Sequence, residues 1–264
     1  MNLTLGEALR FGTSEIGRRD AMLLLCFAAG KTEADILLHG GELLPSEEYF
    51  SLVSRCKNGE PVQYIIGTWD FFGRTFRVDK RALIPRPETE LLVEQALFFL
   101  VKAIDSKYVL DLCTGSGCIA ASIAAAGHYN VTAADISPEA LSLATENGEG
   151  LGINFVLSDL FENIAGTFDV IVSNPPYITA EEMVNLSPTV AAHEPHLALF
   201  GGTDGMDIYR KLIPQSLKFL KPGGVLLLEI GPKEVKDIMV EAGFKDVTLK
   251  NDYAGLPRIV YGVR

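Results

Sequence analysis

The chain has 264 residues, a hydrophobic content of 48% and a formal net charge of -11 at pH 7. This length accommodates one large domain, or a medium domain with a smaller partner, and the apolar content argues against intrinsic disorder. An acidic chain lacks the basic face that proteins usually present to a phosphate backbone, so nucleic acid is not expected as a direct ligand.

The start of the chain shows no pattern typical of export or of a membrane anchor. Its longest apolar run, residues 21–29, is nine residues long, whereas a transmembrane helix needs about 20. We therefore expect a cytoplasmic protein that does not bind membranes. Its cysteines lack a metal-binding or disulfide spacing and are expected to be reduced thiols: Cys26, Cys56, Cys113 and Cys118.

Residues 1–70 are predicted to form a small helical domain, and a role in substrate binding is suggested only by its position in the chain. Thr4 and Glu7 have the spacing of a capping box, and Thr32 with Asp35 has the same spacing with Asp in the fourth place. Acidic residues after Pro45 indicate the first turn of a further helix.

Residues 71–87 interrupt this helical pattern. Apolar and polar residues alternate around Gly73, as in a short hairpin, and Pro85 and Pro87 stiffen the connector that follows. A helix is then predicted from about residue 88 to 104. We expect residues 88–264 to form the second domain.

From residue 107 onward, strands alternate with helices, which predicts an α/β fold with a parallel sheet covered on both faces. A closing hairpin would make this sheet mixed. The expected strands are residues 108–112, 130–135, 153–157, 168–173, 224–230, 246–250 and 258–263. The expected helices are residues 117–126, 137–147, 205–220 and 232–242.

A glycine-rich loop follows the first of these strands and precedes a helix. Gly115 and Gly117 allow a tight turn and a close approach of the backbone to a ligand. Asp135 ends the next strand, twenty residues after Gly115 (135 − 115), where a carboxylate can accept hydrogen bonds from both hydroxyls of a ribose. The spacing is typical of nucleotide-binding βαβ units. It predicts an adenosine-containing cofactor, the simpler alternative being a structural turn.

Asp159 ends the third strand of this series. Its carboxylate could accept a hydrogen bond from the exocyclic amine of an adenine, while Leu160 packs on the ring. An aspartate that only stabilises a turn is an equally simple reading.

Asn174, Pro175, Pro176 and Tyr177 follow a strongly apolar strand, and ligands bind beyond the carboxyl ends of strands in open α/β sheets. The two prolines fix φ and remove two backbone donors, which leaves a stiff segment rich in acceptors. If the Asn174 oxygen and the Pro175 carbonyl each accept one N–H of a planar NH2 group, its nitrogen is oriented for attack. Tyr177 would stack on the flat group. The loop therefore predicts methyl transfer to an amide or amine nitrogen.

Two other clusters are weaker candidates. His193 and His196 are three positions apart, but a zinc-protease motif requires the second histidine at the next position and an unbroken helix. No metal site is expected. The charged residues of the connector either line a cleft or face solvent, and the sequence does not decide between these: Arg86, Glu88 and Glu90.

Together these segments resemble the HemK/PrmC group, the bacterial N5-glutamine methyltransferases of class 1 peptide chain release factors. The resemblance covers nearly the whole chain, and its motifs occur in the right order. The matching segments are residues 61–67, 83–90, 111–117, 135–141, 174–177, 194–195, 201–205, 229–231 and 252–258.

The resemblance implies a Rossmann-like, seven-stranded class I methyltransferase sheet with a helical N-terminal domain that helps to bind the release factor. It implies S-adenosylmethionine as cofactor, S-adenosylhomocysteine as product, and the glutamine of a Gly-Gly-Gln motif as acceptor. The implied cofactor-binding residues are Asp111, Cys113, Thr114, Gly115, Ser116, Gly117, Asp135, Ile136, Asp159, Leu160 and Asn174. The implied catalytic residues are Asn174, Pro175, Pro176 and Tyr177, and a monomer is expected.

The chain departs from the family pattern at position 113, where cysteine replaces a frequent glycine. We expect an ordinary φ at this residue because it carries a side chain. The segments at residues 127–130 and 147–153 are also shorter than is usual in the family. A tighter connection between the strands could alter how Asp159 and Leu160 cover the adenine.

Other functions explain part of the pattern. A nicotinamide-dependent oxidoreductase would account for the glycine loop and Asp135, but not for residues 174–177. An adenine-N6 DNA methyltransferase can share that tetrapeptide, although the net charge opposes it. A glutamine methyltransferase acting on a ribosomal protein is the nearest alternative, but such enzymes typically lack the run at residues 86–90. A release-factor-binding module without activity would not need the intact loops.

Overall fold

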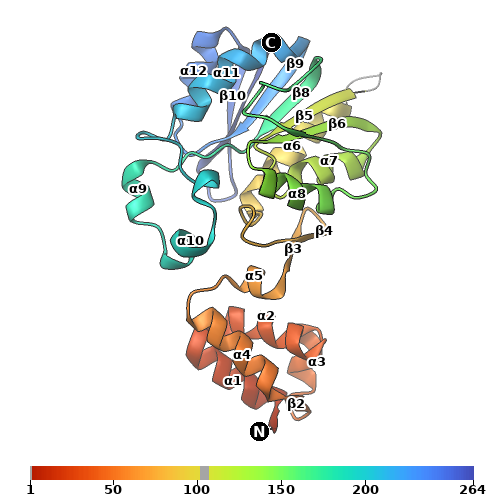
Figure 1. The fold of residues 1–264 in the computed structure, drawn as a ribbon, viewed down its shortest axis with the longest axis vertical. Coiled ribbons are helices and arrows are strands. Elements are labelled where there is room, and N and C mark those ends of the chain that lie inside the picture. The colour runs from red at the N-terminus through yellow and green to blue at the C-terminus, as the bar shows by residue number, and fades with distance from the viewer. Residues whose placement is uncertain (1, 102–106) are drawn as a thin grey trace. The chain divides into compact units, whose positions relative to one another are not determined.

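The computed structural model describes residues 2–101 and 107–264. The chain folds into two compact units (Figure 1). The helical unit comprises Met1–Thr68 with Ser187–His193, and the sheet unit comprises Trp69–Leu186 with Glu194–Arg264. No helix in the described ranges is both long and apolar enough to cross a membrane.

The helical unit starts its helices as the sequence predicts. Thr4 accepts from the Glu7 N–H at 3.3 Å while the Glu7 carboxylate accepts from the Thr4 N–H at 2.8 Å, and Thr32 and Asp35 form the same reciprocal box. Both capping boxes are confirmed. The helices of this unit are α1 (Leu5–Ile16), α2 (Arg18–Ala29), α3 (Glu33–Leu38), α4 (Ser46–Lys57), α5 (Val62–Ile66) and α10 (Pro188–His193).

A short antiparallel strand pair in this unit was not predicted. β1 (Asn2–Thr4) pairs with β2 (Leu43–Pro45). Three residues on each side are too few for a period-two pattern to stand out, and the partners are far apart in sequence. Leu5, Leu24 and Tyr49 belong to the buried core that holds these helices together.

The sheet unit begins at Trp69, within the first strand of the predicted hairpin. β3 (Thr68–Phe71) and β4 (Arg74–Arg77) pair across Gly73, whose φ is +69°. A 3₁₀ turn, η1 (Pro87–Thr89), then leads into α6 (Glu90–Val101). The predicted end of this helix, residues 102–104, lies outside the described residues.

The seven-stranded sheet confirms the predicted α/β architecture. Its order is β10-β11-β9-β8-β5-β6-β7, in which β11 is antiparallel to both neighbours and the other pairs are parallel. The closing hairpin therefore makes the sheet mixed, as expected. The strands are β5 (Lys107–Leu112), β6 (Tyr129–Asp135), β7 (Asn154–Leu157), β8 (Phe168–Ser173), β9 (Leu220–Glu229), β10 (Lys245–Asn251) and β11 (Pro257–Val263).

Two stretches differ from the prediction. β9 begins at Leu220 rather than at 224, because the register shifts between Phe168 and Val170 and lets the Pro-Gly-Gly stretch stay in the strand. The segment between β8 and the next long helix contains elements that were not predicted. These are α9 (Ala180–Val184), α10 and the 3₁₀ turn η2 (His196–Ala198), and they are too short for helical periodicity to be read.

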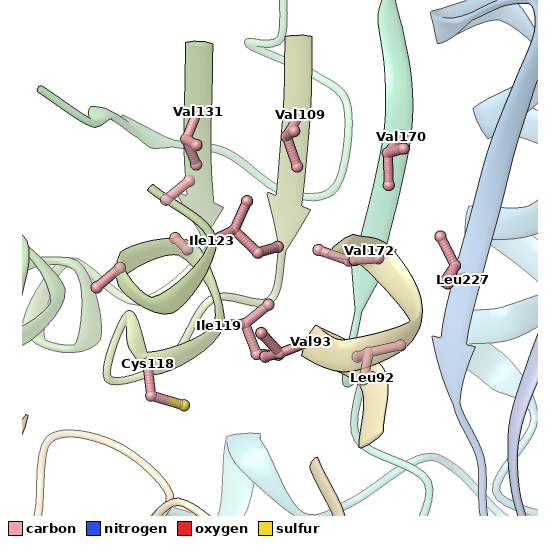
Figure 2. Close-up of a cluster of buried hydrophobic side chains, with 14 of the residues drawn as sticks. Leu92, Val93, Val109, Cys118, Ile119, Ile123, Val131, Val170, Val172 and Leu227 are labelled. Carbon is pink, nitrogen blue, oxygen red and sulfur yellow. The ribbon is translucent and has the colours of Figure 1, made fainter. Parts of the chain in front are cut away.

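Helices cover both faces of the sheet. Val109 and Val131 of the strands pack against α6 and α7 (Cys118–Ala126) in one core (Figure 2). Leu110, next to Val109, and Leu226 of β9 point to the opposite face and pack with α11 (Asp207–Phe219) and α12 (Val235–Ala242). α8 (Pro138–Asn147) connects β6 to β7. This alternation follows the period of two along each strand.

The order in which successive strands are added to the sheet reverses at β5. This strand pairs with β6 on one side and with β8 on the other. A crevice at such a switch point, beyond the carboxyl ends of the strands, is where open α/β sheets bind ligands. The predicted site residues lie at this edge, at the ends of β5 and β6 and in the loops that follow β5, β6, β7 and β8.

Candidate functional site

A pocket of about 200 Å³ lies at this edge of the sheet unit. It brings together residues from the loops after β5, β6, β7 and β8, and the connector and η2 complete its wall. The predicted site residues that line it are Cys113, Thr114, Gly115, Ser116, Asp135, Ile136, Asp159, Leu160, Asn174 and Pro176. Asp111, Gly117, Pro175 and Tyr177 are not among its lining residues.

Asp111 lies beneath the glycine loop and holds its shape. The carboxylate Oδ2 accepts from the Thr114 hydroxyl at 2.6 Å and from the Ala120 N–H at 3.1 Å. The loop is thereby tied to the first turn of α7. Gly115 and Gly117 have φ of +55° and +78°, a region that glycine adopts without steric cost.

The second oxygen of Asp111 is an unusual buried acceptor. Asp111 is fully buried, and Oδ1 has no hydrogen-bond partner within the described ranges. Burial raises the pKa of Asp111 to about 7, against the hydrogen bonds from Thr114 and Ala120 that lower it. A positive group in the adjoining pocket would favour the ionised form of this carboxyl.

Cys113 contradicts the expectation of an ordinary φ. Its φ is +56°, in the left-handed region that is uncommon for residues with a side chain. The loop therefore turns here as it would with the glycine frequent in the family. Such a conformation persists when the surroundings over-determine it, and it is concentrated at functional sites.

Asp135 is at the carboxyl end of β6 and faces the pocket. Its two oxygens accept from the N–H groups of Gly115 and Ser137, both at 2.9 Å. These bonds fix the carboxylate between two loops and leave further lone pairs for a ligand. Burial raises the pKa of Asp135, although these same backbone bonds counteract the shift. The next residue, Ile136, is 48% exposed.

Asp159 and Leu160 line the same pocket after β7. Leu160 has a φ of +47°, and its carbonyl accepts from the Ser158 hydroxyl at 2.9 Å. The shortened crossover therefore still delivers both residues to the pocket. Their contact with an adenine stays a prediction.

Three glycines enclose the Asn174–Tyr177 loop. A Cβ at Gly201 would lie 2.5 Å from the Tyr177 Cα, and one at Gly205 would lie 2.3 Å from the Tyr177 carbonyl oxygen. A Cβ at Gly231 would lie 2.5 Å from Cδ2 of the Tyr177 ring. Only glycine permits this packing, so the loop is held by segments far along the chain. The pKa of Tyr177 is raised, mainly by burial.

The Asn174 side chain begins a series of hydrogen bonds with two residues that were not predicted as part of the site. Its Nδ2 donates to the Thr89 hydroxyl at 3.3 Å, and that hydroxyl donates to Oε2 of Glu229 at 2.7 Å. Thr89 and Glu229 are 3% and 2% exposed. In the sequence, Glu229 stands out as an acidic residue at the end of an otherwise apolar strand. In the sheet it follows Leu228, which pairs with Ser173, the residue before Asn174.

The connector lines part of the pocket and is held there by the buried carboxylate of Glu194. Glu194 accepts from the Ile84 N–H at 3.3 Å and from the Arg86 guanidinium at 2.5 Å. Arg86 lines the pocket, whereas Glu88 is exposed and Glu90 accepts from the Phe72 N–H at 2.8 Å. The three charged residues of the connector thus have three different environments. Within the described ranges, no group of three or more potential metal-ligating side chains is found.

Comparison with known proteins identifies relatives of both units. Residues 7–67 match the family model of the PrmC N-terminal domain, and residues 89–193 match that of the methyltransferase small domain. The release factor glutamine methyltransferase of Koribacter versatilis is 43% identical over 257 residues, which cover 93% of this chain and 90% of that protein. The enzyme of the same name from Clostridium acetobutylicum is 40% identical over 272 aligned positions, covering 98% and 95%.

Solved structures support the fold of the sheet. The 16S rRNA N2 G1207 methyltransferase RsmC of T. thermophilus, in complex with AdoMet and guanosine, matches with a TM-score of 0.55 and 18% identity over 75% of this chain and 49% of that one. A methyltransferase from Pyrococcus furiosus matches with a TM-score of 0.52 and 21% identity over 73% and 90%. The architecture is therefore that of methyltransferases.

Proposed function

The chain belongs to the release factor glutamine methyltransferase family, and from this we propose its reaction in detail. It transfers a methyl group from S-adenosylmethionine to the side-chain amide nitrogen, N5, of the glutamine in the Gly-Gly-Gln motif of class 1 peptide chain release factors. S-adenosylhomocysteine is the second product.

The observation that carries this proposal is that one pocket includes both predicted loops. Residues 113–116 and Asp135 line it together with Asn174 and Pro176. A cofactor on the first loop and an acceptor at the second would therefore share one cavity. Methyl transfer requires such proximity, and correct placement of two reactants can account for a large part of the barrier reduction.

The residues present fit an adenosine-containing, positively charged cofactor. The Asp135 carboxylate keeps lone pairs for ribose hydroxyls, and Asp159 with Leu160 would hold the adenine. The carboxyl of Asp111, with its unpartnered Oδ1, lies beneath the loop, where a positively charged cofactor would favour its ionised form. When bound, S-adenosylmethionine supplies an electrophilic methyl group. The chain's own residues bind it, orient the acceptor and keep the loops in place.

Asn174 and Pro175 would hold the acceptor amide. Because Asn174 Nδ2 is bonded to Thr89, its Oδ1 is the end left to accept an N–H, and the Pro175 carbonyl would accept the other. An amide nitrogen is a poor nucleophile because its lone pair is delocalised, and two acceptors favour the pyramidal geometry of attack. Tyr177 would stack on the amide plane and Pro176 would keep the loop rigid. No strong general base is needed, because the N–H becomes acidic once the methyl group arrives.

The release factor is the partner we propose, bound as a protein with the help of the helical unit. A chain of net charge -11 suits a basic protein surface better than a nucleic acid. The match of residues 7–67 to the PrmC N-terminal domain supports a role of this unit specific to the family.

Transfer of a labelled methyl group from S-adenosylmethionine to a purified release factor tests the proposal. A release-factor variant in which the motif glutamine is replaced by alanine is the matched control. We expect label on the native factor and none on the variant. Label on neither, with the cofactor still bound, would overturn the proposed substrate and direct the search to ribosomal proteins or nucleic acid.

A further inference from the structure

A buried row of hydrogen bonds links Asn174 to two residues from distant parts of the chain. Thr89 ends η1 and lies 85 residues before Asn174 in the sequence. Glu229 ends β9 and lies 140 residues after Thr89. The Thr89 hydroxyl lies between them, accepting from Asn174 Nδ2 and donating to Glu229 Oε2. The proposed function uses the bond from Asn174 to Thr89 to identify the free end of the amide, but it gives Glu229 no part and does not say what fixes the direction of that bond.

The direction of these bonds determines which end of Asn174 faces the acceptor. A carboxylate has no hydrogen and can only accept, whereas a threonine hydroxyl has one hydrogen to give. Once that hydrogen is given to Glu229, the hydroxyl can only accept from Asn174. The amide must therefore turn its NH2 to Thr89, and the opposite orientation would place two oxygens against each other.

We propose that Thr89 and Glu229 are positioning residues for the methyl transfer, because they keep the Asn174 carbonyl oxygen turned toward the acceptor amide. This inference rests on the proposed function, in which Asn174 holds the acceptor nitrogen. A reversed side chain would present NH2 to the NH2 of glutamine, donor against donor. The acceptor would then lose one of the two bonds that orient it.

The environment of Glu229 supports a role beyond folding. A buried carboxylate costs more free energy than an apolar side chain of similar size unless it is well paired. Burial raises the pKa of Glu229 to about 7, although the Thr89 hydroxyl and the nearby Arg258 lower it. Folding stability alone does not require a carboxyl group at position 229. A carboxylate is required if the Thr89 hydroxyl must always donate to this position, because a carboxylate has no hydrogen to donate back.

A double-mutant cycle tests the inference. Thr89→Val keeps the shape and removes the hydroxyl, Thr89→Ser keeps the hydroxyl, and each is made in the native chain and in Asn174→Ala. The measured quantities are the single-turnover rate of methyl transfer to the release factor, the Kd of S-adenosylmethionine and Tm. Thr89→Val should lower the single-turnover rate about 10- to 100-fold in the native chain, whereas Thr89→Ser should keep most of the native rate. The Kd of S-adenosylmethionine should be unchanged in both variants.

In the Asn174→Ala background, Thr89→Val should lower the rate no further, because Thr89 acts through Asn174. Ser216→Ala is the matched control for a lost buried hydroxyl, since Ser216 is buried and donates only to the Ile213 carbonyl of its own helix at 2.7 Å. It should lower Tm and leave the rate unchanged.

Glu229→Gln provides a second route if Thr89→Val does not fold. A glutamine can give an N–H to Thr89, which frees the threonine hydrogen for Asn174 and allows the reversed orientation. We expect a lower rate at pH 8 with an unchanged or higher Tm, whereas a purely structural role would lower Tm and spare the rate. If Thr89→Val lowered the single-turnover rate by the same factor in the native chain and in Asn174→Ala, the inference would be overturned while the proposed function would stand. A full rate for Asn174→Ala would overturn the role of Asn174 in the proposed function as well.

Discussion

The two loops of the pocket are built by different means. The loop at 113–117 is shaped locally, by positive φ at Cys113, Gly115 and Gly117 and by Asp111, two residues before it. The loop at 174–177 is stiffened by its prolines but oriented by contacts from distant segments, through Gly231 and Thr89. A local backbone shape suits a cofactor that many proteins share, whereas long-range contacts can adapt the second loop to one acceptor.

The largest effect is expected from crowding the first loop. Gly117→Ala places a Cβ 2.9 Å from the Ala144 Cβ and 3.0 Å from its Cα, at a φ of +78°. Left-handed strain of about 1–2 kcal/mol adds to overpacking of about 1–3 kcal/mol. We expect the free energy of unfolding to fall by about 2–5 kcal/mol, with weaker binding of S-adenosylmethionine, as measured by urea denaturation and calorimetry.

Gly150→Ala is the matched control for that substitution. Gly150 has the same φ of +78°, but its Cβ would meet nothing within 4 Å. It should lower the free energy of unfolding by the strain alone, about 1–2 kcal/mol, and leave cofactor binding unchanged. Equal effects of the two variants would contradict the close packing of the loop on α8.

A smaller effect, on rate alone, is expected from disturbing the second loop. Gly231→Ala would displace the Tyr177 ring, whose Cδ2 lies 2.5 Å from the new Cβ. A displacement near 1 Å can lower a rate about 100-fold, so we expect that loss in single turnover with an unchanged Kd for S-adenosylmethionine. Gly41→Ala, where a Cβ meets nothing within 4 Å, should keep the native rate. A weakened Kd in Gly231→Ala would show that the loops are not independent.

The smallest effect is a pH dependence from Glu229. The pKa of Glu229 is raised to about 7, and the charged groups that act on it are Arg258, Glu88 and Arg86. Because the ionised form is the one that only accepts, the single-turnover rate should rise about fourfold between pH 6.5 and 8. The rate of Glu229→Gln should lack this contribution, and a profile unchanged by the substitution would contradict it.

Stability should change with pH in the opposite direction. The folded-state pKa of Glu229 lies above its ordinary value of 4.5, so the folded state binds the proton more tightly than the unfolded chain. The stabilisation is complete below about pH 4.5 and is lost as pH rises through about 7. Asp111 titrates in the same range, so the contribution of Glu229 is the difference between native and Glu229→Gln unfolding curves.

The difference between local and long-range contacts also explains what could be predicted from the sequence. The strand–helix alternation, the capping boxes at Thr4 and Thr32 and the glycine loop depend on residues close in sequence, and the structure confirms these elements. The φ of Cys113 was predicted wrongly, because a side chain disfavours the left-handed region but the surrounding bonds impose it. Thr89 and Glu229 were missed because their contacts arise only when the η1 turn and the end of β9 meet Asn174 in the folded chain.

The short elements between β8 and α11 were missed for a related reason. α9 has five residues and η2 has three, which is too short for a periodic pattern. Their positions depend on contacts such as the Ile178 N–H with the Leu199 carbonyl at 2.9 Å. The sequence therefore predicts the sheet and the two loops, but not the packing that orients Asn174.

The division of labour between the two loops is tested most directly by Asn174→Ala. The single-turnover rate of methyl transfer to the release factor and the Kd of S-adenosylmethionine would be measured on the same preparation. We predict a rate about 100- to 1,000-fold lower, as for the loss of one preorganised polar group in other enzymes, with a Kd within about threefold of native, below 1 kcal/mol. A Kd that weakens in parallel with the rate would contradict the account, because it would show that Asn174 acts mainly by binding the cofactor rather than by holding the acceptor.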